Sequence, residues 1–257
     1  LNSGDHVIAM DDLYGGTYRL FEDVRKRSSG LEFSFVDLSD SKKLQEAIRP
    51  NTKMIWVESP TNPLLKLVDL SVIAKFAKDN NIISVCDNTF CSPYIQKPLD
   101  FGIDIVVHSA TKYLNGHSDV VGGVVVCAED REDLSDDMFY LSNSVGGILS
   151  PFDSFLLLRS LKTLSVRMDR HCESALKLSK FLENHKAIEK VIYPGLTSHP
   201  QHNVAKKQMH KFGGMITAIL KGGLNASKTF LENTKIFSLA ESLGGVESLI
   251  EHPAIMT

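Results

Sequence analysis

Four short polar segments hold the residues of this chain that are best suited to chemistry. Each follows an apolar run that reads as a strand, and together they are residues 11–17, 59–63, 87–89 and 109–112. Ligands of a parallel α/β sheet bind beyond the carboxyl ends of its strands. We therefore expect the four segments to meet at one rim of a sheet.

Lys112 is the most reactive group in these segments. A lysine amine that is partly desolvated in a cleft has a lowered pKa and can attack a carbonyl to form an imine. A single lysine after a strand is more often a solvated surface side chain. The hydroxyls of Ser109 and Thr111, just before it, can hydrogen-bond a phosphate and favour a functional role.

A carboxylate and an aromatic ring complete the pattern. Asp87 ends an apolar run, where burial raises its pKa unless a cation or hydrogen-bond donors hold its charge. A helix N-cap is the ordinary alternative for such an aspartate, and a protonated pyridine nitrogen is the functional one. Tyr14 stands in a turn with Gly15 and Gly16, which leaves its ring able to stack on a ligand. A flat, phosphorylated, cationic aldehyde needs these groups, and pyridoxal phosphate is that molecule.

Other motifs give weaker interpretations. Ser109-Ala110-Thr111-Lys112 also fits the S-x-x-K nucleophile motif of penicillin-binding enzymes, but its companion motifs are missing. Neither a P-loop nor G-x-G-x-x-G occurs. A non-catalytic scaffold on the same fold stays an alternative, because a fold does not by itself define a function.

The elements that must position these residues follow an alternating pattern. Apolar runs at residues 6–10, 32–36, 53–58, 82–86, 105–108 and 122–127 predict strands, and residues 17–27, 41–48 and 70–80 predict helices between them. This order is typical of an α/β domain with a parallel-rich sheet.

The pattern changes near Ser150. Ser150-Pro151-Phe152-Asp153 supplies an N-cap, a proline at the first helical position and an acid beyond them. Apolar residues then recur at steps of three or four to about Leu182, which predicts one long helix that links two domains. Residues 214–220 and 235–240 predict strands around a helix near 226–232. We expect a cofactor-binding α/β domain over residues 1–155 and an α+β domain over residues 156–257.

Composition excludes several classes of partner. The 28 basic and 31 acidic residues are interspersed and give a net charge of −3, so we expect no nucleic-acid partner. Apolar runs such as residues 120–127 are too short to cross a bilayer, and no leader segment begins the chain, so we expect no membrane partner and a cytoplasmic location.

Cysteine spacing argues against a metal site. The four cysteines form no C-x-x-C pair and have no paired histidines at ligand spacing, so we expect buried, reduced thiols and no metal. The chain begins with Leu1 and ends at Thr257 without a polar tail, and we expect it to be a piece of a longer protein that lacks its N-terminal part and is truncated at its C-terminal end.

Five motifs carry a family resemblance that runs in order along the whole chain. They are DLYGGT (residues 12–17), ESPTNP (58–63), DNTF (87–90), SATKYLNGHSD (109–119) and LAESLGG (239–245). These motifs resemble the transsulfuration enzymes of cysteine and methionine metabolism that act on cystathionine. The resemblance implies the aspartate-aminotransferase type of fold, pyridoxal phosphate as cofactor, and a homotetramer built as a dimer of dimers.

The resemblance also implies roles for single residues. Lys112 would bind the cofactor and move protons, Asp87 would pair with the pyridine nitrogen, and Tyr14 would stack on the ring and assist proton transfer. Ser109 and Thr111 would hold the phosphate. The substrate and cofactor pocket would be lined by Glu58, Asn62, Glu241, Ser242 and Thr257, with Glu241 facing the distal ammonium of cystathionine.

The choice of activity within this family depends on fewer residues. Methionine γ-lyases usually have a cysteine at the position of Gly16 and an apolar residue at that of Glu241, so both residues argue against that activity. An acidic residue at position 241 suits a substrate with a second amino group. We predict cystathionine γ-lyase activity, with cystathionine γ-synthase and β-lyase activities as alternatives.

Overall fold

The computed structural model describes residues 1–256, which form two compact units. The first unit comprises residues 1–88, 96–108 and 124–149, and the second comprises residues 89–95, 109–123 and the described residues from Ser150 onward. The domain boundary that the sequence suggests at residue 155 stays a prediction. Thr257, predicted to line the substrate pocket, lies outside the described residues.

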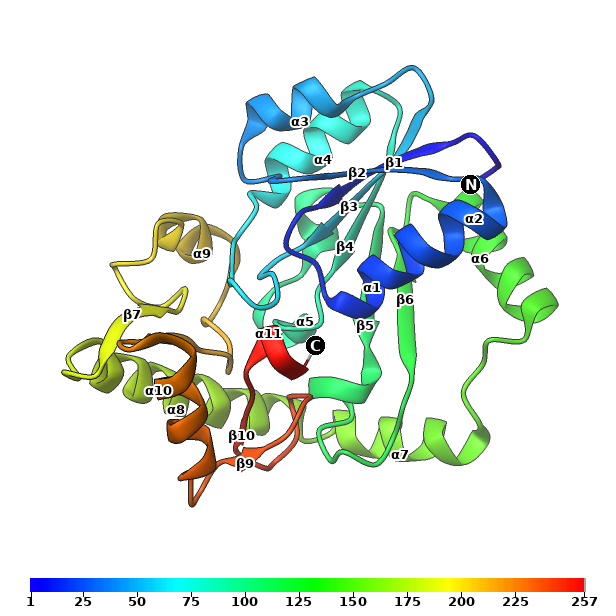
Figure 1. Cartoon of the computed structure of the whole chain (residues 1–257). Helices are drawn as coiled ribbons and strands as arrows, with labels where there is room; N and C mark the ends of the chain where they lie inside the picture. The colour runs from blue at the N-terminus through cyan, green and yellow to red at the C-terminus, as the bar shows by residue number, and fades with distance from the viewer. Residues whose placement is uncertain (257) are drawn as a thin grey trace. The chain divides into compact units, whose positions relative to one another are not determined.

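A six-stranded sheet in the order β2-β1-β3-β4-β5-β6 is the centre of the first unit (Figure 1). The pairs β1–β2, β1–β3, β3–β4 and β4–β5 are all parallel. The predicted α/β class is therefore confirmed. The strands are β1 (His6–Met10), β2 (Glu32–Val36), β3 (Thr52–Glu58), β4 (Ile83–Asp87), β5 (Ile105–Ser109) and β6 (Gly123–Cys127).

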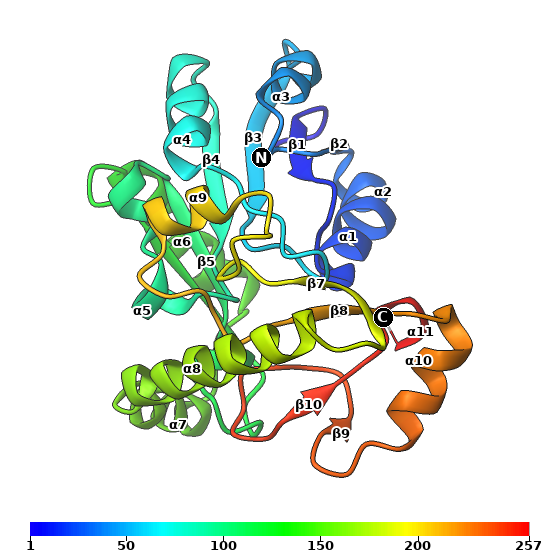
Figure 2. The ribbon, with the colours of Figure 1, turned by 90° about the vertical axis from the view of Figure 1, so that its left-hand side faces the viewer.

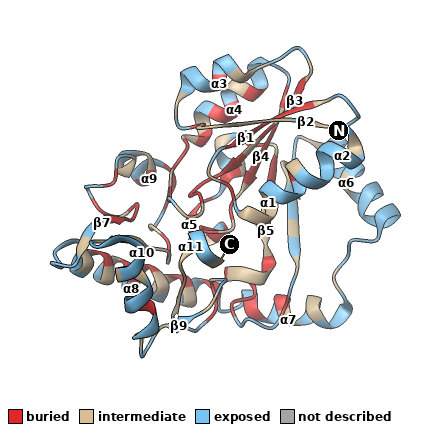
Figure 3. Ribbon diagram, viewed as in Figure 1, coloured by how far each residue is buried: buried red, intermediate tan, exposed pale blue. Residues whose placement is uncertain are grey.

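The middle strands of this sheet are deeply buried (Figure 3). All five residues of β1 are buried, and Ile55 of β3 has no exposed surface. Nearly continuous apolar runs are typical of parallel strands that are covered on both faces. The helix α4 (Leu70–Asp79) packs on β4 through an apolar side that includes Ile73, and α3 (Ser41–Ala47) packs on β2.

The remaining helices of the first unit are connectors. After β1 and a short loop, the chain is helical without a break from Gly15 to Ser29, which covers the predicted helix over residues 17–27. Its parts are α1 (Gly15–Arg19), η1 (Leu20–Arg25) and α2 (Lys26–Ser29), and η2 (Pro98–Phe101) and α6 (Glu132–Val145) follow later in the chain. The helix α6 was not predicted, because its sequence is mostly polar.

Parallel pairing brings the carboxyl ends of β1, β3, β4 and β5 to one edge of the sheet. The register pairs Glu58 with Asp87 and Asp87 with Val107. The polar loops after β1, β3 and β4 therefore begin at the same edge, as predicted for these three.

The second unit contains two small ribbons and several helices. β7 and β8 are antiparallel, β9 and β10 are parallel, and α8 lies along the β7–β8 ribbon (Figure 2). The elements are α5 (Ser92–Ile95), η3 (Ala110–Leu114), α7 (Pro151–Leu161), α8 (Leu164–Glu183), β7 (Ile188–Ile192), α9 (His202–Gln208), β8 (Thr217–Leu220), α10 (Gly223–Glu232), β9 (Ser238–Leu239), β10 (Leu249–Ile250) and α11 (Pro253–Met256).

The prediction of one long helix from Ser150 to Leu182 is wrong. The side chain of Ser150 does accept a hydrogen bond from the backbone of Asp153, as its capping role requires, but α7 ends at Leu161 and α8 begins at Leu164. At the break, Thr163 leaves the helical conformation, and its backbone N–H and its hydroxyl both donate to the carbonyl of Ser160. Such local bonds from threonine compete with the helical ladder.

No helix among residues 1–256 is long and apolar enough to span a membrane. Within the same residues, no group of three or more histidine, cysteine, aspartate or glutamate side chains could hold a metal ion. None of the four cysteines forms a disulfide; Cys86, Cys91 and Cys172 are buried, and Cys127 is partly exposed.

Candidate active site

The predicted site residues fall into two groups, one in each unit. Tyr14, Glu58, Asn62 and Asp87 belong to the first unit. The second unit contains the other described members, which are Ser109, Thr111, Lys112, Glu241 and Ser242. Each group has a geometry of its own.

Glu58 is the centre of the first group. It is the last residue of β3, and only 4% of its surface is exposed. The backbone N–H of Tyr14 donates to one carboxylate oxygen and that of Asn62 donates to the other, each at 3.0 Å. Glu58 therefore joins the loops after β1 and β3 to each other.

Two carboxylates stand side by side at the ends of β3 and β4, because Glu58 is the register partner of Asp87. Burial, reinforced by the negative charge of Asp87, raises the pKa of Glu58 well above its ordinary value. The two backbone N–H donors act in the opposite direction but do not outweigh burial. The end of this strand pair thus favours a cation or a bound proton.

Tyr14, whose backbone N–H donates to Glu58, is an exposed residue. Its backbone ends the loop after β1, while 48% of its surface is open. A Cβ atom at Gly16 would lie 2.4 Å from the ring of Tyr14, so the ring can take this position only because Gly16 has no side chain. The stacking role of Tyr14 stays a prediction.

Hydrogen bonds that the sequence analysis missed support the same edge of the sheet. Asn88 and Gln96 are fully buried and bond each other through their side-chain amides, and Gln96 also donates to the carbonyl of Ser59. Asp12 accepts from the hydroxyl of Thr61 in the next loop. Asn88 lies within a motif that the sequence marked, whereas a single glutamine such as Gln96 gives no signal.

Lys112 is the centre of the second group. It is half-buried, and its ammonium donates to the hydroxyl of Ser242 at 2.8 Å. Burial lowers the pKa of the Lys112 amine, and the carboxylates of Glu251 and Glu241 act in the opposite direction. This is the environment that favours a neutral, nucleophilic amine.

Glu251 is a member of this group that the sequence analysis missed. It follows β10, and Glu241 follows β9 two residues after Leu239; β9 and β10 pair in parallel. Burial and the charge of Glu241 raise the pKa of Glu251. The ribbon therefore places two acids near Lys112, although ten residues separate them in the sequence.

The two hydroxyls before Lys112 differ in their surroundings. Thr111 accepts from the backbone N–H of Gly122 at 3.0 Å, so its oxygen is already engaged. The hydroxyl of Ser109 makes no hydrogen bond with any residue in the range 1–256, while the backbone N–H of Ser109 donates to Thr89 at 2.8 Å. Ser109 is the more available of the two for an anionic group.

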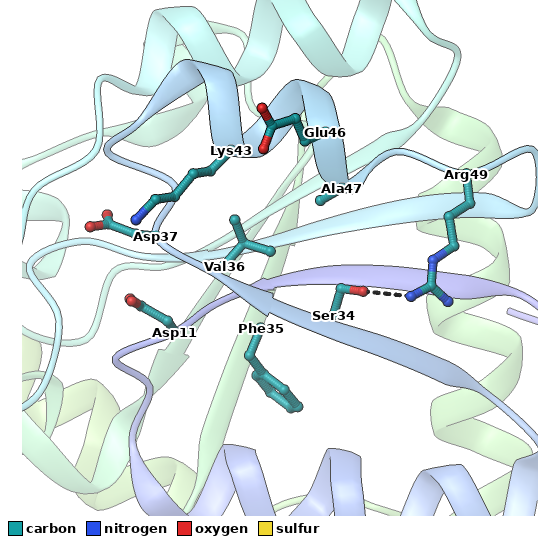
Figure 4. A pocket seen from close by; sticks show the side chains of 9 residues that line it. All are labelled: Asp11, Ser34, Phe35, Val36, Asp37, Lys43, Glu46, Ala47 and Arg49. Carbon is teal, nitrogen blue, oxygen red and sulfur yellow. Dashed lines mark hydrogen bonds between the residues drawn. The ribbon is translucent and has the colours of Figure 1, made fainter.

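A hollow of about 540 Å³ lies beside α3 and β2 in the first unit (Figure 4). Asp11 is its only member from the four polar segments, and Lys66 neutralises Asp11 at 2.9 Å. Arg49, at the other end, pairs with Glu32. Asp11 and Arg49 thus have ion-pair partners outside the lining of the hollow, and we do not place the active site there.

A parallel-rich sheet with polar strand ends, together with a desolvated lysine that follows one of the strands, is typical of enzymes that bind pyridoxal phosphate covalently. Comparison with known families gives the same class. The family model described as Cys/Met metabolism PLP-dependent enzyme matches residues 1–257. The chain belongs to this family, whose members depend on pyridoxal phosphate.

Curated relatives carry more than one activity in their names. The chain is 62% identical to cystathionine beta-lyase of Coxiella burnetii and 53% identical to cystathionine gamma-lyase of Dictyostelium discoideum, in each case over its whole length. It spans 66% of the length of both relatives. The names support the family and leave the exact reaction open.

Solved structures agree on the fold. Cystathionine gamma-lyase from Lactobacillus plantarum, complexed with L-serine, matches with a TM-score of 0.97 and 48% identity. Cystathionine gamma synthase from Xanthomonas oryzae pv. oryzae, in complex with cystathionine, matches with a TM-score of 0.96 and 44% identity. Each match covers 100% of this chain and 66% of the other.

In the cofactor-free protein, we expect the free energy of unfolding to fall less with rising pH in the Glu58→Gln variant than in the unsubstituted protein. A carboxyl whose pKa is higher in the folded than in the unfolded state binds more protons when folded. The free energy of unfolding then falls as pH rises from the ordinary glutamate pKa, about 4.3, through the raised value. Glutamine cannot ionise, so this contribution disappears. Thermal unfolding followed from about pH 5 to about pH 8 measures the difference.

The matched control is Glu46→Gln, at an exposed position of α3. It should leave the pH dependence of the unfolding temperature unchanged. Equal pH dependence in the Glu58 variant and the unsubstituted protein would contradict a raised pKa at Glu58.

Proposed function

We propose that the protein binds pyridoxal phosphate, with Lys112 as the lysine that bonds to it. The observation that carries this proposal is the half-buried Lys112 amine, whose pKa is lowered by burial and whose hydrogen-bond partner is Ser242. The segment that holds Lys112 continues directly from β5, the strand next to β4 and Asp87.

The residues fit the chemical groups of the cofactor. An amine suits its aldehyde, the Ser109 hydroxyl suits its phosphate, and the exposed ring of Tyr14 suits its flat face. The paired carboxylates Glu58 and Asp87 suit a positively charged ring nitrogen, because a cation there relieves the repulsion that raises the pKa of Glu58. When bound, pyridoxal phosphate supplies an electron sink for a carbanion on the substrate.

Lys112 would then act as the base and acid of the reaction. With its pKa lowered, the amine takes the α proton of an amino-acid substrate and returns protons to later carbons. Ser242 holds the amine while it is not bonded to the cofactor. Asp87 keeps the ring nitrogen charged, and Tyr14 orients the ring.

We propose γ-elimination of cystathionine as the reaction. Loss of the α proton and then of a β proton allows the γ carbon–sulfur bond to break, and cysteine leaves as its thiolate and takes up a proton. Water then releases the remaining carbon chain. Cystathionine and water thus give cysteine, 2-oxobutanoate and ammonia, in the route of transsulfuration that makes cysteine.

Glu241 favours a substrate with two amino groups. Its exposed carboxylate lies on the ribbon whose charges act on Lys112, together with Glu251. An ammonium on the far end of cystathionine pairs with such a carboxylate. A side chain at Gly16 would collide with the ring of Tyr14, which is consistent with an activity other than that of methionine γ-lyases.

We also propose the homotetramer of the family and a cytoplasmic location. Large apolar side chains are exposed on α6, where Phe139 is 78% exposed, and on α7, where Phe152 and Leu158 are 68% and 65% exposed. These side chains support the proposal to the extent that they form contiguous patches, because contiguous exposed apolar patches mark surfaces that other chains cover.

The reaction is tested by incubating the enzyme, expressed from its complete gene, with cystathionine. We expect 2-oxobutanoate and cysteine in equal amounts. Pyruvate and homocysteine instead would assign β-lyase activity, and a requirement for an O-acylhomoserine together with cysteine would assign γ-synthase activity. A protein that shows no visible absorbance with pyridoxal phosphate and forms no product would be a scaffold on this fold.

The role of Glu241 is tested with Glu241→Gln. Losing a charge-assisted hydrogen bond to the distal ammonium should raise the KM for cystathionine by about tenfold or more, with a smaller change in kcat. Glu232→Gln, at an exposed position on α10, is the control. An unchanged KM for cystathionine, or an equal rise for O-acetylhomoserine, which has no distal ammonium, would remove Glu241 from substrate recognition.

A further inference from the structure

The backbone just after Lys112 is held by an arginine from a distant part of the sequence. Arg167 lies in the first turn of α8, and its guanidinium donates to the carbonyl of Tyr113 at 2.7 Å and to that of Leu114 at 3.4 Å. The last carbonyls of a helical turn have no donor within the turn. Arg167 supplies donors to two of them directly after the lysine.

The same guanidinium also satisfies the break between α7 and α8. It donates to the carbonyl of Ser160 at 3.0 Å and to the hydroxyl of Thr163 at 3.1 Å. The helix break, which the sequence pattern did not predict, therefore supplies two of the groups that accept hydrogen bonds from Arg167. The guanidinium of Arg167 thus links the break between α7 and α8 to the backbone just after Lys112.

Gly116 leaves room for this guanidinium because it has no side chain. It has a φ of +72°, and a Cβ atom there would lie 2.0 Å from one terminal nitrogen of Arg167. Its backbone N–H donates to the carbonyl of Lys112 at 2.8 Å. A side chain at position 116 would thus displace the arginine from the carbonyls that it binds.

Arg167 forms no ion pair with any of residues 1–256. Every hydrogen-bond partner of its guanidinium in the described part of the chain is a carbonyl or a hydroxyl, and burial lowers its pKa. Burying a cation without an ion pair costs free energy, which makes a purely stabilising role a poor explanation. A lysine could not replace it, because only the fork of arginine reaches several carbonyls at once.

The other side of the lysine segment is held by Gly244. A Cβ atom there would lie 2.5 Å from the backbone nitrogen of Tyr113 and 2.7 Å from the carbonyl carbon of Lys112. Lys112 itself leaves the helical conformation, with φ −92° and ψ −127°. The backbone of Lys112 is therefore fixed between the close contact with Gly244 and the carbonyls bound by Arg167.

We propose that Arg167 is a positioning residue for Lys112: it fixes the backbone from which the amine is presented. It acts through geometry and not through charge. Its positive charge bears on His171, whereas the charges that bear on Lys112 are those of Glu251 and Glu241. The inference rests on the proposed role of Lys112 as the cofactor-binding lysine.

The test compares Arg167→Met and Arg167→Lys with the unsubstituted enzyme, expressed from its complete gene and freed of cofactor. Pyridoxal phosphate is added, and the growth of visible absorbance measures how fast the lysine bonds to it. Both variants should be slower by about 10- to 100-fold, because a displacement near 1 Å has effects of this size. Arg170→Met is the control, since the side chain of Arg170 is 77% exposed on the same helix.

A second readout separates positioning from general structural damage. In a Lys112→Ala background position 112 can form no covalent bond, and pyridoxal phosphate binding is followed by quenching of tryptophan fluorescence, to which Trp56 contributes. If Arg167 acts through Lys112, adding Arg167→Met should change this affinity by less than about twofold. Equal weakening of binding with and without Lys112 would overturn the proposal.

Glycine variants keep the test valid if the arginine variants fail to fold. Gly116→Ala should slow the covalent step, whereas Gly146→Ala should not, because position 146 has a similar φ of +79° with no atom within 4 Å of a Cβ. Equal rates in the two variants would contradict the proposal. If the unsubstituted enzyme itself gives no visible absorbance, it is the proposed role of Lys112 that fails.

Discussion

An amine attacks an aldehyde only after it has lost its proton, and the burial of Lys112 favours this loss. Burial lowers the pKa of Lys112, while Glu251 and Glu241 hold it from falling further. Ser242 accepts a hydrogen bond from the amine and fixes its direction. The balance between burial and nearby acids decides whether Lys112 is a nucleophile or an ordinary surface ammonium.

In the first unit the buried ionisable groups are acids and not an amine. Glu58 and Asp87 end adjacent parallel strands, and their proximity together with burial raises the pKa of Glu58. One solution is a proton on Glu58, and the other is a cation at the strand ends. The proposed cofactor supplies such a cation with its ring nitrogen. The ends of β3 and β4 therefore favour a positively charged group.

The sequence predicted the middle of the sheet well because strands such as β1 are buried along their whole length. Continuous apolar runs such as residues 6–10 have no competing interpretation, and β1 and β2 have the predicted bounds. The break between α7 and α8 was not predicted, because the apolar period continues through Lys162 and Thr163. What ends the helix there is a set of local hydrogen bonds to the carbonyl of Ser160.

The sequence indicated candidate site residues only where a single segment contains the motif that marks them. The motif of residues 109–119 marks Lys112, and Asp87 ends a strand as expected. Glu251 and Arg167 belong to segments that reach Lys112 only through folding. Arg167 follows the ordinary polar pattern of a helix, and nothing in its own sequence neighbourhood indicates carbonyl partners more than 50 residues away.

The central claim is that Lys112 bonds covalently to pyridoxal phosphate. Borohydride reduction of the cofactor-loaded enzyme makes such a bond permanent, and digestion followed by peptide mass spectrometry locates it. We expect the added mass of the reduced cofactor on Lys112, and its absence from the protein in which Lys112 is replaced by alanine. The same mass on another lysine, with Lys112 unmodified, would contradict the account.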